Sequence, residues 1–207
     1  MMGNRPSLKL TYFNFSGRAE PIRLAFYIGG IEFEDVRLSR EEFVAMKPDL
    51  PSGQLPILEV DGFTLSQSGA ILRYAGKLSG LYPADDLEAA KVDMNMGLVE
   101  DIMTKVAATM SISDEREKMA VRQKLATEVL PVWLGHLQKA LEACGDYFGG
   151  SSINVADLAA QQCLKWLTGG ILDGIPATIL DDFPVLSSYL ERMNAVPKLV
   201  DYYESRS

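Results

Sequence analysis

The chain has 207 residues, of which 47% are hydrophobic and 23% charged, and this composition is that of an ordinary globular protein rather than a disordered one. Its formal net charge of −8 argues against general binding to nucleic acids or anionic membranes, because both need clustered positive charge. Two cysteines without Cys-x-x-Cys spacing and one histidine exclude a disulfide framework, a thiolate zinc site and most histidine-based triads. The first residues lack the apolar run of a signal peptide, and no segment resembles a membrane span. We therefore expect a cytoplasmic protein without a metal.

The first eighty residues change their hydrophobic period repeatedly, which predicts a small α/β domain. The predicted strands cover residues 8–12, 33–38, 56–60 and 63–65. The predicted helices cover residues 17–28, a short segment after Ser39 and a segment that opens at residues 66–68. This β-α-β-α-β-β-α order requires parallel pairing across helical connections in its first half, and a hairpin at Asp61-Gly62 in its second.

The remaining residues have only helical patterns. Long helices are predicted over residues 87–111 and 114–143, with a bend at Pro131 in the second. Further helices are predicted after a capping box of Asn154 and Asp157, and with first turns at Pro184 and Pro197. We thus predict an α/β domain at 1–81, a linker at 82–87 and an all-α domain at 88–207.

Three features converge at one end of the predicted sheet. Tyr12 ends the first strand and faces the start of the helix that opens at 17–20, where the helix dipole is positive. The turn at 54–56 enters the third strand, and a cis proline there would leave the backbone of Leu55 as an edge for an extended peptide. Residues 67–68 begin another helix, whose free amide groups favour a carboxylate.

These motifs, in this order, resemble those of the cytosolic glutathione transferases. They are Tyr12-Phe13 with Gly17-Arg18-Ala19-Glu20-Pro21-Ile22-Arg23, then Gln54-Leu55-Pro56-Ile57-Leu58, then Ser66-Gln67-Ser68-Gly69-Ala70-Ile71 with Tyr74. The resemblance covers nearly the whole chain and is greatest to the sigma class, which includes haematopoietic prostaglandin D synthase. It implies a thioredoxin-like N-terminal domain, an all-helical C-terminal domain and a homodimer.

The resemblance also implies an activity and a site. The enzyme would activate the thiol of glutathione as a thiolate and add it to small apolar electrophiles, a detoxification reaction in which glutathione is a co-substrate and no metal takes part. Tyr12 would be the catalytic hydroxyl, with Arg18 supporting it. Glutathione would be bound by Tyr12, Phe13, Phe43, Lys47, Gln54, Leu55, Pro56, Gln67 and Ser68, and by Asp101 of the neighbouring subunit. The electrophile would lie against Phe13, Phe15, Met103 and Met110.

Individual roles follow from the same resemblance. Lys47 would meet the glycine carboxylate of glutathione, and Leu55 would pair with the backbone of its cysteine. Gln67 and Ser68 would hold the γ-glutamyl end, whose amine Asp101 would reach across the subunit boundary.

Two positions depart from the family pattern. Phe43 stands where sigma members usually carry a tryptophan that donates a hydrogen bond to glutathione, and Lys47 is the candidate to compensate. Ser52 stands where many classes have an aromatic residue that enters the partner subunit. We therefore expect a polar subunit interface, with Arg73 and either Asp93 or Asp101 as candidate partners.

Other interpretations stay open. Glutathione-dependent isomerisation, as in prostaglandin D synthase, would use the same residues around the thiol. A non-catalytic lens-type protein or ligand carrier is a different class, but lens-type relatives often carry a long insertion that is not apparent between Asp101 and Asp157. From position alone, Tyr12 could be structural, and Lys47 could be an ordinary surface residue.

Overall fold

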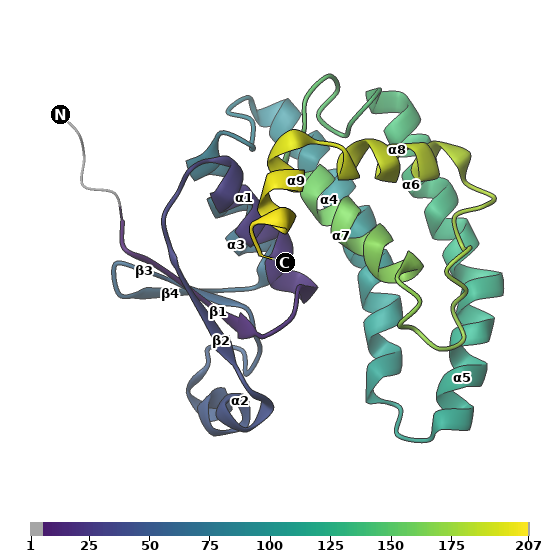
Figure 1. The fold of residues 1–207 in the computed structure, drawn as a ribbon, viewed down its shortest axis with the longest axis horizontal. Helices are drawn as coiled ribbons and strands as arrows, with labels where there is room; N and C mark the ends of the chain where they lie inside the picture. The colour runs from purple at the N-terminus through teal and green to yellow at the C-terminus, as the bar shows by residue number, and fades with distance from the viewer. Residues whose placement is uncertain (1–5, 207) are drawn as a thin grey trace. The chain divides into compact units, whose positions relative to one another are not determined.

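The computed structural model describes residues 6–206 (Figure 1). Residues 1–5, on which the expectation of a missing signal peptide partly rests, lie outside this range. Contacts divide the chain into two compact units, one up to Tyr82 and one from Pro83 onward. The first unit contains β1 (Leu8–Phe13), a 3-10 turn (Gly17–Ala19), α1 (Glu20–Ile28), β2 (Glu34–Leu38), α2 (Arg40–Met46), a 3-10 turn (Lys47–Asp49), β3 (Ile57–Val60), β4 (Phe63–Ser66) and α3 (Ser68–Ser79).

The four strands form one mixed sheet in the order β2-β1-β3-β4. β1 pairs with β2 in parallel, and β3 pairs antiparallel with both β1 and β4. This topology confirms the predicted order of elements, the parallel crossover and the hairpin. The capped start of the short second helix is also confirmed, because the Ser39 hydroxyl accepts a hydrogen bond from the Glu42 amide at 3.2 Å.

α1 and α3 lie side by side against the sheet (Figure 1). Their inward residues and those of β1 and β3 are fully buried, namely Leu10, Ile22, Leu24, Phe26, Leu58 and Ile71. The predicted helix at 17–28 is present, but its first turn is 3-10. Pro21 has no amide hydrogen to give to the carbonyl of Gly17, so the regular α-helical pattern begins only after this turn.

The second unit is helical, as predicted, in the part of the chain that the structure describes. It contains α4 (Asp86–Ala107), a 3-10 turn (Ala108–Ser111), α5 (Glu115–Lys124), a π-helical turn (Leu125–Val129), α6 (Leu130–Cys144), α7 (Val155–Thr168), α8 (Pro184–Asn194) and α9 (Pro197–Glu204). Pro184 and Pro197 stand in the first turns of α8 and α9, which confirms both predictions. No helix within residues 6–206 combines the length and the apolar character that a membrane crossing needs.

The segment before Pro131 contains a π-helical turn that the sequence did not predict. α5, the π-helical turn and α6 follow one another directly from Glu115 to Cys144. The amide of Leu130 donates to the carbonyl of Leu125, five residues earlier, so the helix widens by one residue immediately before the proline. Pro131 has no amide hydrogen of its own, and the widened turn accommodates this loss.

The predicted capping box at the start of α7 is present and buried. The side chain of Asn154 accepts from the amide of Ala156 at 2.8 Å, and the carboxylate of Asp157 accepts from the amide of Asn154 at 2.8 Å. The same carboxylate accepts from the amide of Phe148 at 2.9 Å and from the hydroxyl of Tyr189 at 3.0 Å. One side chain therefore joins the start of α7 to the preceding loop and to α8.

Candidate active site

The strand register brings the three predicted segments to one end of the sheet. Thr11 of β1 pairs with Ile57 of β3, and Ile57 pairs with Ser66 of β4. Tyr12 directly follows Thr11, the 54–56 turn directly precedes Ile57, and Gln67 directly follows Ser66. The predicted convergence is therefore a direct consequence of the register.

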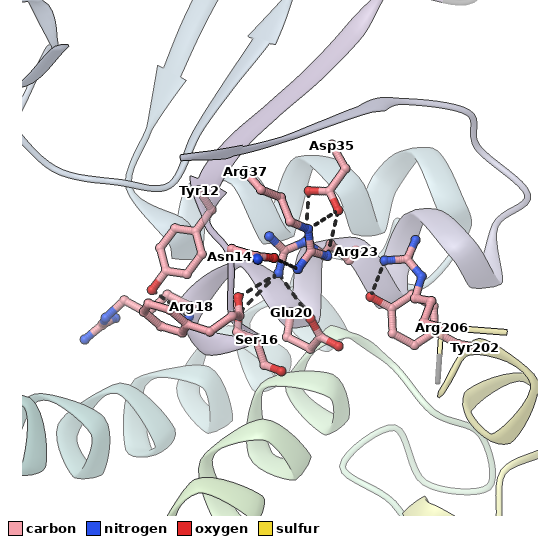
Figure 2. Close-up of polar contacts among 11 residues, drawn as sticks. Tyr12, Asn14, Ser16, Arg18, Glu20, Arg23, Asp35, Arg37, Tyr202 and Arg206 are labelled. Atoms are coloured by element: carbon pink, nitrogen blue, oxygen red, sulfur yellow. Dashed lines mark hydrogen bonds and ion pairs between the residues drawn. The ribbon is translucent and has the colours of Figure 1, made fainter. Parts of the chain in front are cut away.

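Tyr12 is 6% exposed, and its hydroxyl oxygen accepts a hydrogen bond from the backbone amide of Arg18 at 3.2 Å (Figure 2). Burial raises the pKa of Tyr12 above its ordinary value, although this amide and the nearby positive charges of Arg18 and Arg23 oppose the rise. The phenol consequently stays protonated at neutral pH. Because its oxygen already accepts from Arg18, its own hydrogen is available to a different acceptor.

Gly17 makes this arrangement of Tyr12 possible. Its φ is +46°, and a Cβ placed on it would lie 2.5 Å from the Tyr12 hydroxyl oxygen. Only glycine adopts this conformation without strain, and only glycine leaves space for the phenol. The backbone of residue 17 therefore forms one wall around the hydroxyl.

Arg18 contributes a backbone amide to the site. Its amide donates to the Tyr12 hydroxyl, while Figure 2 shows its guanidinium directed away from that hydroxyl. The guanidinium carbon of Arg23 instead lies 5.9 Å from the centre of the Tyr12 ring. The structure thus places next to Tyr12 a second arginine that the sequence analysis did not select.

Arg23 is fully buried and holds the loop that follows Tyr12. It donates to the backbone carbonyls of Phe15 at 3.1 Å and Ser16 at 3.3 Å, and pairs with Glu20 at 3.2 Å and Asp35 at 3.0 Å (Figure 2). One guanidinium nitrogen, Nη2, is buried without a hydrogen-bond partner. The sequence does contain a sign that Arg23 is unusual, because this charged residue directly follows Ile22 in a helix stripe that is otherwise apolar.

Two predicted aromatic residues pack against Tyr12, and a third packs against one of them. The rings of Phe13 and Phe15 each lie 5.4 Å from the ring of Tyr12, edge to face, and stack on one another at 5.6 Å. Phe43 meets Phe13 edge to face at 5.1 Å. Phe43 therefore completes an aromatic cluster without offering a hydrogen-bond donor. Lys47, predicted to compensate, places its ammonium 6.0 Å from the ring of Phe43.

The turn between α2 and β3 carries three more predicted residues. The peptide bond between Leu55 and Pro56 is cis, as predicted. Within the described residues, the backbone of Leu55 takes part in no hydrogen bond of a turn or cap. A Cβ on Gly53 would lie 3.7 Å from the Cε of Lys47, so the stem of this lysine runs alongside Gly53, the residue before Gln54.

Gln67 and Ser68 form the start of α3. Gln67 is the residue before the helix and has a φ of +71°, which is uncommon for a residue other than glycine. Its carbonyl accepts from the amides of Ala70 and Ile71 at 3.0 Å. The amides of Ser68 and Gly69 lie before Ala70 in the first turn of α3, and first-turn amides have no acceptor within their own helix.

The other predicted site residues belong to the second unit. Asp101 is exposed on α4, and Met103 is half-buried on the same helix. Met110 is 58% exposed and lies in the 3-10 turn after α4, outside the helix that carries Met103. Cys163 is buried and Cys144 is half-buried. Within residues 6–206, no cluster of histidine, cysteine and carboxylate side chains is arranged to hold a metal ion.

Comparison with known proteins gives a family for the chain. The profile for "Glutathione S-transferase, N-terminal domain" matches residues 8–77, and that for "Glutathione S-transferase, C-terminal domain" matches residues 100–206. The chain is 34% identical to "Glutathione S-transferase 1" of Ascaris suum over 206 residues, with 97% of each chain covered. It is 33% identical to "Hematopoietic prostaglandin D synthase" of Gallus gallus over 204 residues, again with 97% of each chain covered.

A solved structure agrees with these relatives. The structure of prostaglandin synthase D of Nilaparvata lugens superposes with a TM-score of 0.87 at 30% identity, over 98% of this chain and 99% of the other. Its similarity extends over both units, as do the two family profiles. The thioredoxin-like and all-helical units, the ordered motifs and this full-length similarity lead to one conclusion: the chain is an enzyme of the glutathione S-transferase family.

Proposed function

We propose that this chain is a sigma-like glutathione transferase that binds glutathione at the sheet end carrying Tyr12 and conjugates its thiolate to apolar electrophiles. The observation that carries the proposal is the hydrogen bond from the Arg18 amide to the Tyr12 oxygen, at 3.2 Å in a buried setting. It directs the phenol hydrogen away from Arg18, toward a ligand beside the aromatic cluster. A thiolate sulfur at that position is the acceptor that the hydrogen would meet.

The free energy needed for this step is modest. A cysteine thiol has a pKa of about 8.5, so only about 3% is ionised at pH 7. Lowering that pKa by about two units needs about 2.7 kcal/mol. One hydrogen bond to a charged acceptor contributes about 1.5–3 kcal/mol, so the Tyr12 hydroxyl is nearly sufficient. The positive charges of Arg18 and Arg23 favour the anion further.

Glutathione also fits the other segments at this end of the sheet. Its two carboxylates need positive or amide partners, and its cysteine backbone needs an extended neighbour. We assign the γ-glutamyl carboxylate to the start of α3 at Gln67 and Ser68, the cysteine backbone to Leu55, and the glycine carboxylate to Lys47. Gln54 and Pro56 shape the turn between these contacts, and Phe13 and Phe43 border it.

The remaining assignments belong to the same proposal. The resemblance to the family makes Phe13, Phe15, Met103 and Met110 the candidate contacts of the electrophile. Asp101 would act on the γ-glutamyl amine of glutathione bound by a neighbouring copy, which makes the working enzyme a homodimer. We place this homodimer in the cytoplasm, with a role in detoxification.

A turnover experiment tests the proposed function. Initial rates with glutathione and a panel of small electrophiles are compared between the wild type, Tyr12→Phe and the control Tyr27→Phe. We expect Tyr12→Phe to lower kcat/KM on the order of 10–100-fold while glutathione binding persists, because one charge-assisted hydrogen bond is lost. Tyr27→Phe should leave the rates unchanged. Equal loss in both variants, or none in either, would contradict the assignment of Tyr12.

Glutathione-dependent isomerisation is the second candidate. The similarity to "Hematopoietic prostaglandin D synthase" and the structural agreement with prostaglandin synthase D support it. It would use the same thiolate, but it would return glutathione unchanged. Counting the free thiol before and after turnover therefore separates conjugation, which consumes glutathione, from isomerisation, which does not. Absence of both reactions with intact glutathione binding would indicate a ligand carrier.

A further inference from the structure

A pocket lies within the helical unit, beside the end of α4. Its volume is about 250 Å³, and it is formed by the last turn of α4, the following 3-10 turn, α5 and the π-helical turn. Apolar side chains make up most of its wall, notably Ile112, Val121, Leu125 and Val129. Such a lining suits the apolar body of a small ligand.

Two lysines also line this pocket. They are Lys105 on α4 and Lys124 on α5. The Lys105 ammonium lies 4.3 Å from the centre of the Trp133 ring, and the Lys124 ammonium lies 3.8 Å from the carboxylate of Glu128. The second pair is mostly exposed, so water and salt weaken it. Two positive charges thus border an apolar hollow in a chain whose net charge is −8.

A third positive charge lies behind the wall. Arg122 is 4% exposed and donates to the Thr109 hydroxyl at 2.9 Å, to the carbonyl of Asp173 at 3.4 Å and to the sulfur of Met110 at 3.0 Å. All three acceptors are uncharged, and no carboxylate of residues 6–206 lies within 4.0 Å of this guanidinium. Thr109 itself lines the pocket. A buried cation without a counter-ion is unfavourable, and an anion in the adjoining pocket would reduce that cost.

We propose that this pocket binds a small organic anion with an apolar body, of which a medium-chain carboxylate is the simplest form. Its chain would lie against Ile112, Leu125 and Val129, and its carboxylate would lie between Lys105 and Lys124. Lys105 is two positions beyond Met103 and so projects about 200° around α4 from it. The pocket is therefore on a different face of α4 from the residue assigned to the electrophile, and its ligand is independent of the proposed transferase reaction.

Binding of octanoate to the full-length protein tests this proposal. Calorimetry should show saturable binding of octanoate, and octanol, which has the same chain without a charge, should bind at least tenfold more weakly. Because Lys105 contacts Trp133, octanoate should also change the fluorescence of the single tryptophan in a Trp166→Phe background. Saturating glutathione should leave octanoate affinity unchanged.

Matched variants locate the site. Lys105→Ala and Lys124→Ala should each weaken octanoate binding about threefold to tenfold, less than the loss of a buried charge-assisted contact, because water screens charges at the rim of the pocket. Lys118 is on α5, as Lys124 is, but it pairs with Glu115 and does not line the pocket. Lys118→Ala should therefore have no effect on octanoate binding. Ala108→Phe, which fills the pocket, should abolish binding while the melting temperature is retained. No saturable binding, equal affinity for octanol, or equal loss in the Lys118 variant would overturn the proposal.

Discussion

Arg23 has the strongest set of polar contacts near Tyr12, and it is also the residue whose removal should be most costly. It is fully buried, and it faces the carboxylates of Glu20 and Asp35. Arg37 contacts the same Asp35 at 2.8 Å, but its side chain is 31% exposed. The two arginines share one partner and differ in burial, so they form a natural comparison.

We predict that Arg23→Met lowers the free energy of unfolding by about 3–5 kcal/mol, because it leaves two carboxylates without their buried partner. The matched Arg37→Met change should cost less than about 1 kcal/mol, since its ion pair is open to water. Urea unfolding followed by circular dichroism measures both. Similar losses in the two variants would show that burial of Arg23 does not determine its contribution.

Comparison of alanine variants at Gly17 and Gly30 distinguishes the effect of backbone strain from that of steric contact with Tyr12. Both have positive φ, +46° and +60°, but a Cβ on Gly30 would meet nothing within 4 Å. Gly17→Ala and Gly30→Ala should each destabilise the protein by about 1–2 kcal/mol through strain. Only Gly17→Ala should also lower kcat, because its methyl group displaces the Tyr12 hydroxyl. A fall in kcat for Gly30→Ala, or unchanged kcat for Gly17→Ala, would contradict this account.

Sequence reasoning located the segments of the site better than the interactions within them. Tyr12, Leu55-Pro56 and Gln67-Ser68 could be placed together because strand order determines which ends meet. The roles of Gly17 and Arg23 could not be read in the same way. The role of Gly17 depends on a backbone angle, and that of Arg23 depends on its contact with Asp35 of β2. The apolar stripe of α1 marks Arg23 as an unusual residue, but it does not show which groups Arg23 contacts.

At the level of elements, the start of α7 contains an acid in an unusual environment. Burial raises the pKa of Asp157 to about 6, although hydrogen bonds from Asn154, Phe148 and Tyr189 oppose the rise. The folded protein therefore binds this proton more tightly than the unfolded chain, whose value is near 3.8. Consequently, this carboxyl stabilises the fold most below pH 4, and that contribution is lost as the pH rises through 6.

We predict that Asp157→Asn becomes more stable relative to the wild type, by about 2 kcal/mol, as the pH rises from about 4.5 to about 7. The asparagine oxygen can still accept one of the backbone bonds, but it cannot ionise. The measurement is the free energy of unfolding of both proteins across this pH range, which gives the difference in stability between them at each pH. A stability difference that does not change with pH, or that moves in favour of the wild type as the pH rises, would contradict the raised pKa of Asp157.

The helical elements show where local patterns are sufficient. The capping residues Asn154 and Asp157, and the prolines at 184 and 197, indicated three helix starts correctly because each satisfies a local backbone requirement. The π-helical turn before Pro131 was not predicted. A proline signals that a helical hydrogen bond is missing, but it does not show how the preceding turn adjusts to that loss.

At the level of the whole molecule, the proposed homodimer makes a testable prediction about salt. Ser52 is exposed and offers little apolar area, so we expect polar pairing between subunits that uses Arg73 with Asp93 or Asp101. The Debye length falls from about 10 Å at 0.1 M salt to about 3 Å at 1 M. The dimer dissociation constant should therefore rise with sodium chloride, and Arg73→Ala should raise it at low salt.

Sedimentation velocity at several salt concentrations, with the wild type and Arg73→Ala, measures this constant. An apolar interface would behave in the opposite way, because burial of apolar surface is not screened by salt. A dimer that responds neither to salt nor to the variant would therefore identify an apolar contact. Leu87 and Met94 on α4, 65% and 60% exposed in the single chain, would then be the first candidates.

The central claim is that the Tyr12 hydroxyl stabilises the thiolate of bound glutathione. Its most direct test is the pKa of that thiol, measured by ultraviolet difference absorbance as the pH of the protein–glutathione complex is varied. We predict a pKa about two units below the free value of about 8.5 in the wild type, and a value close to the free one in Tyr12→Phe. The same lowered pKa in both proteins would contradict the claim.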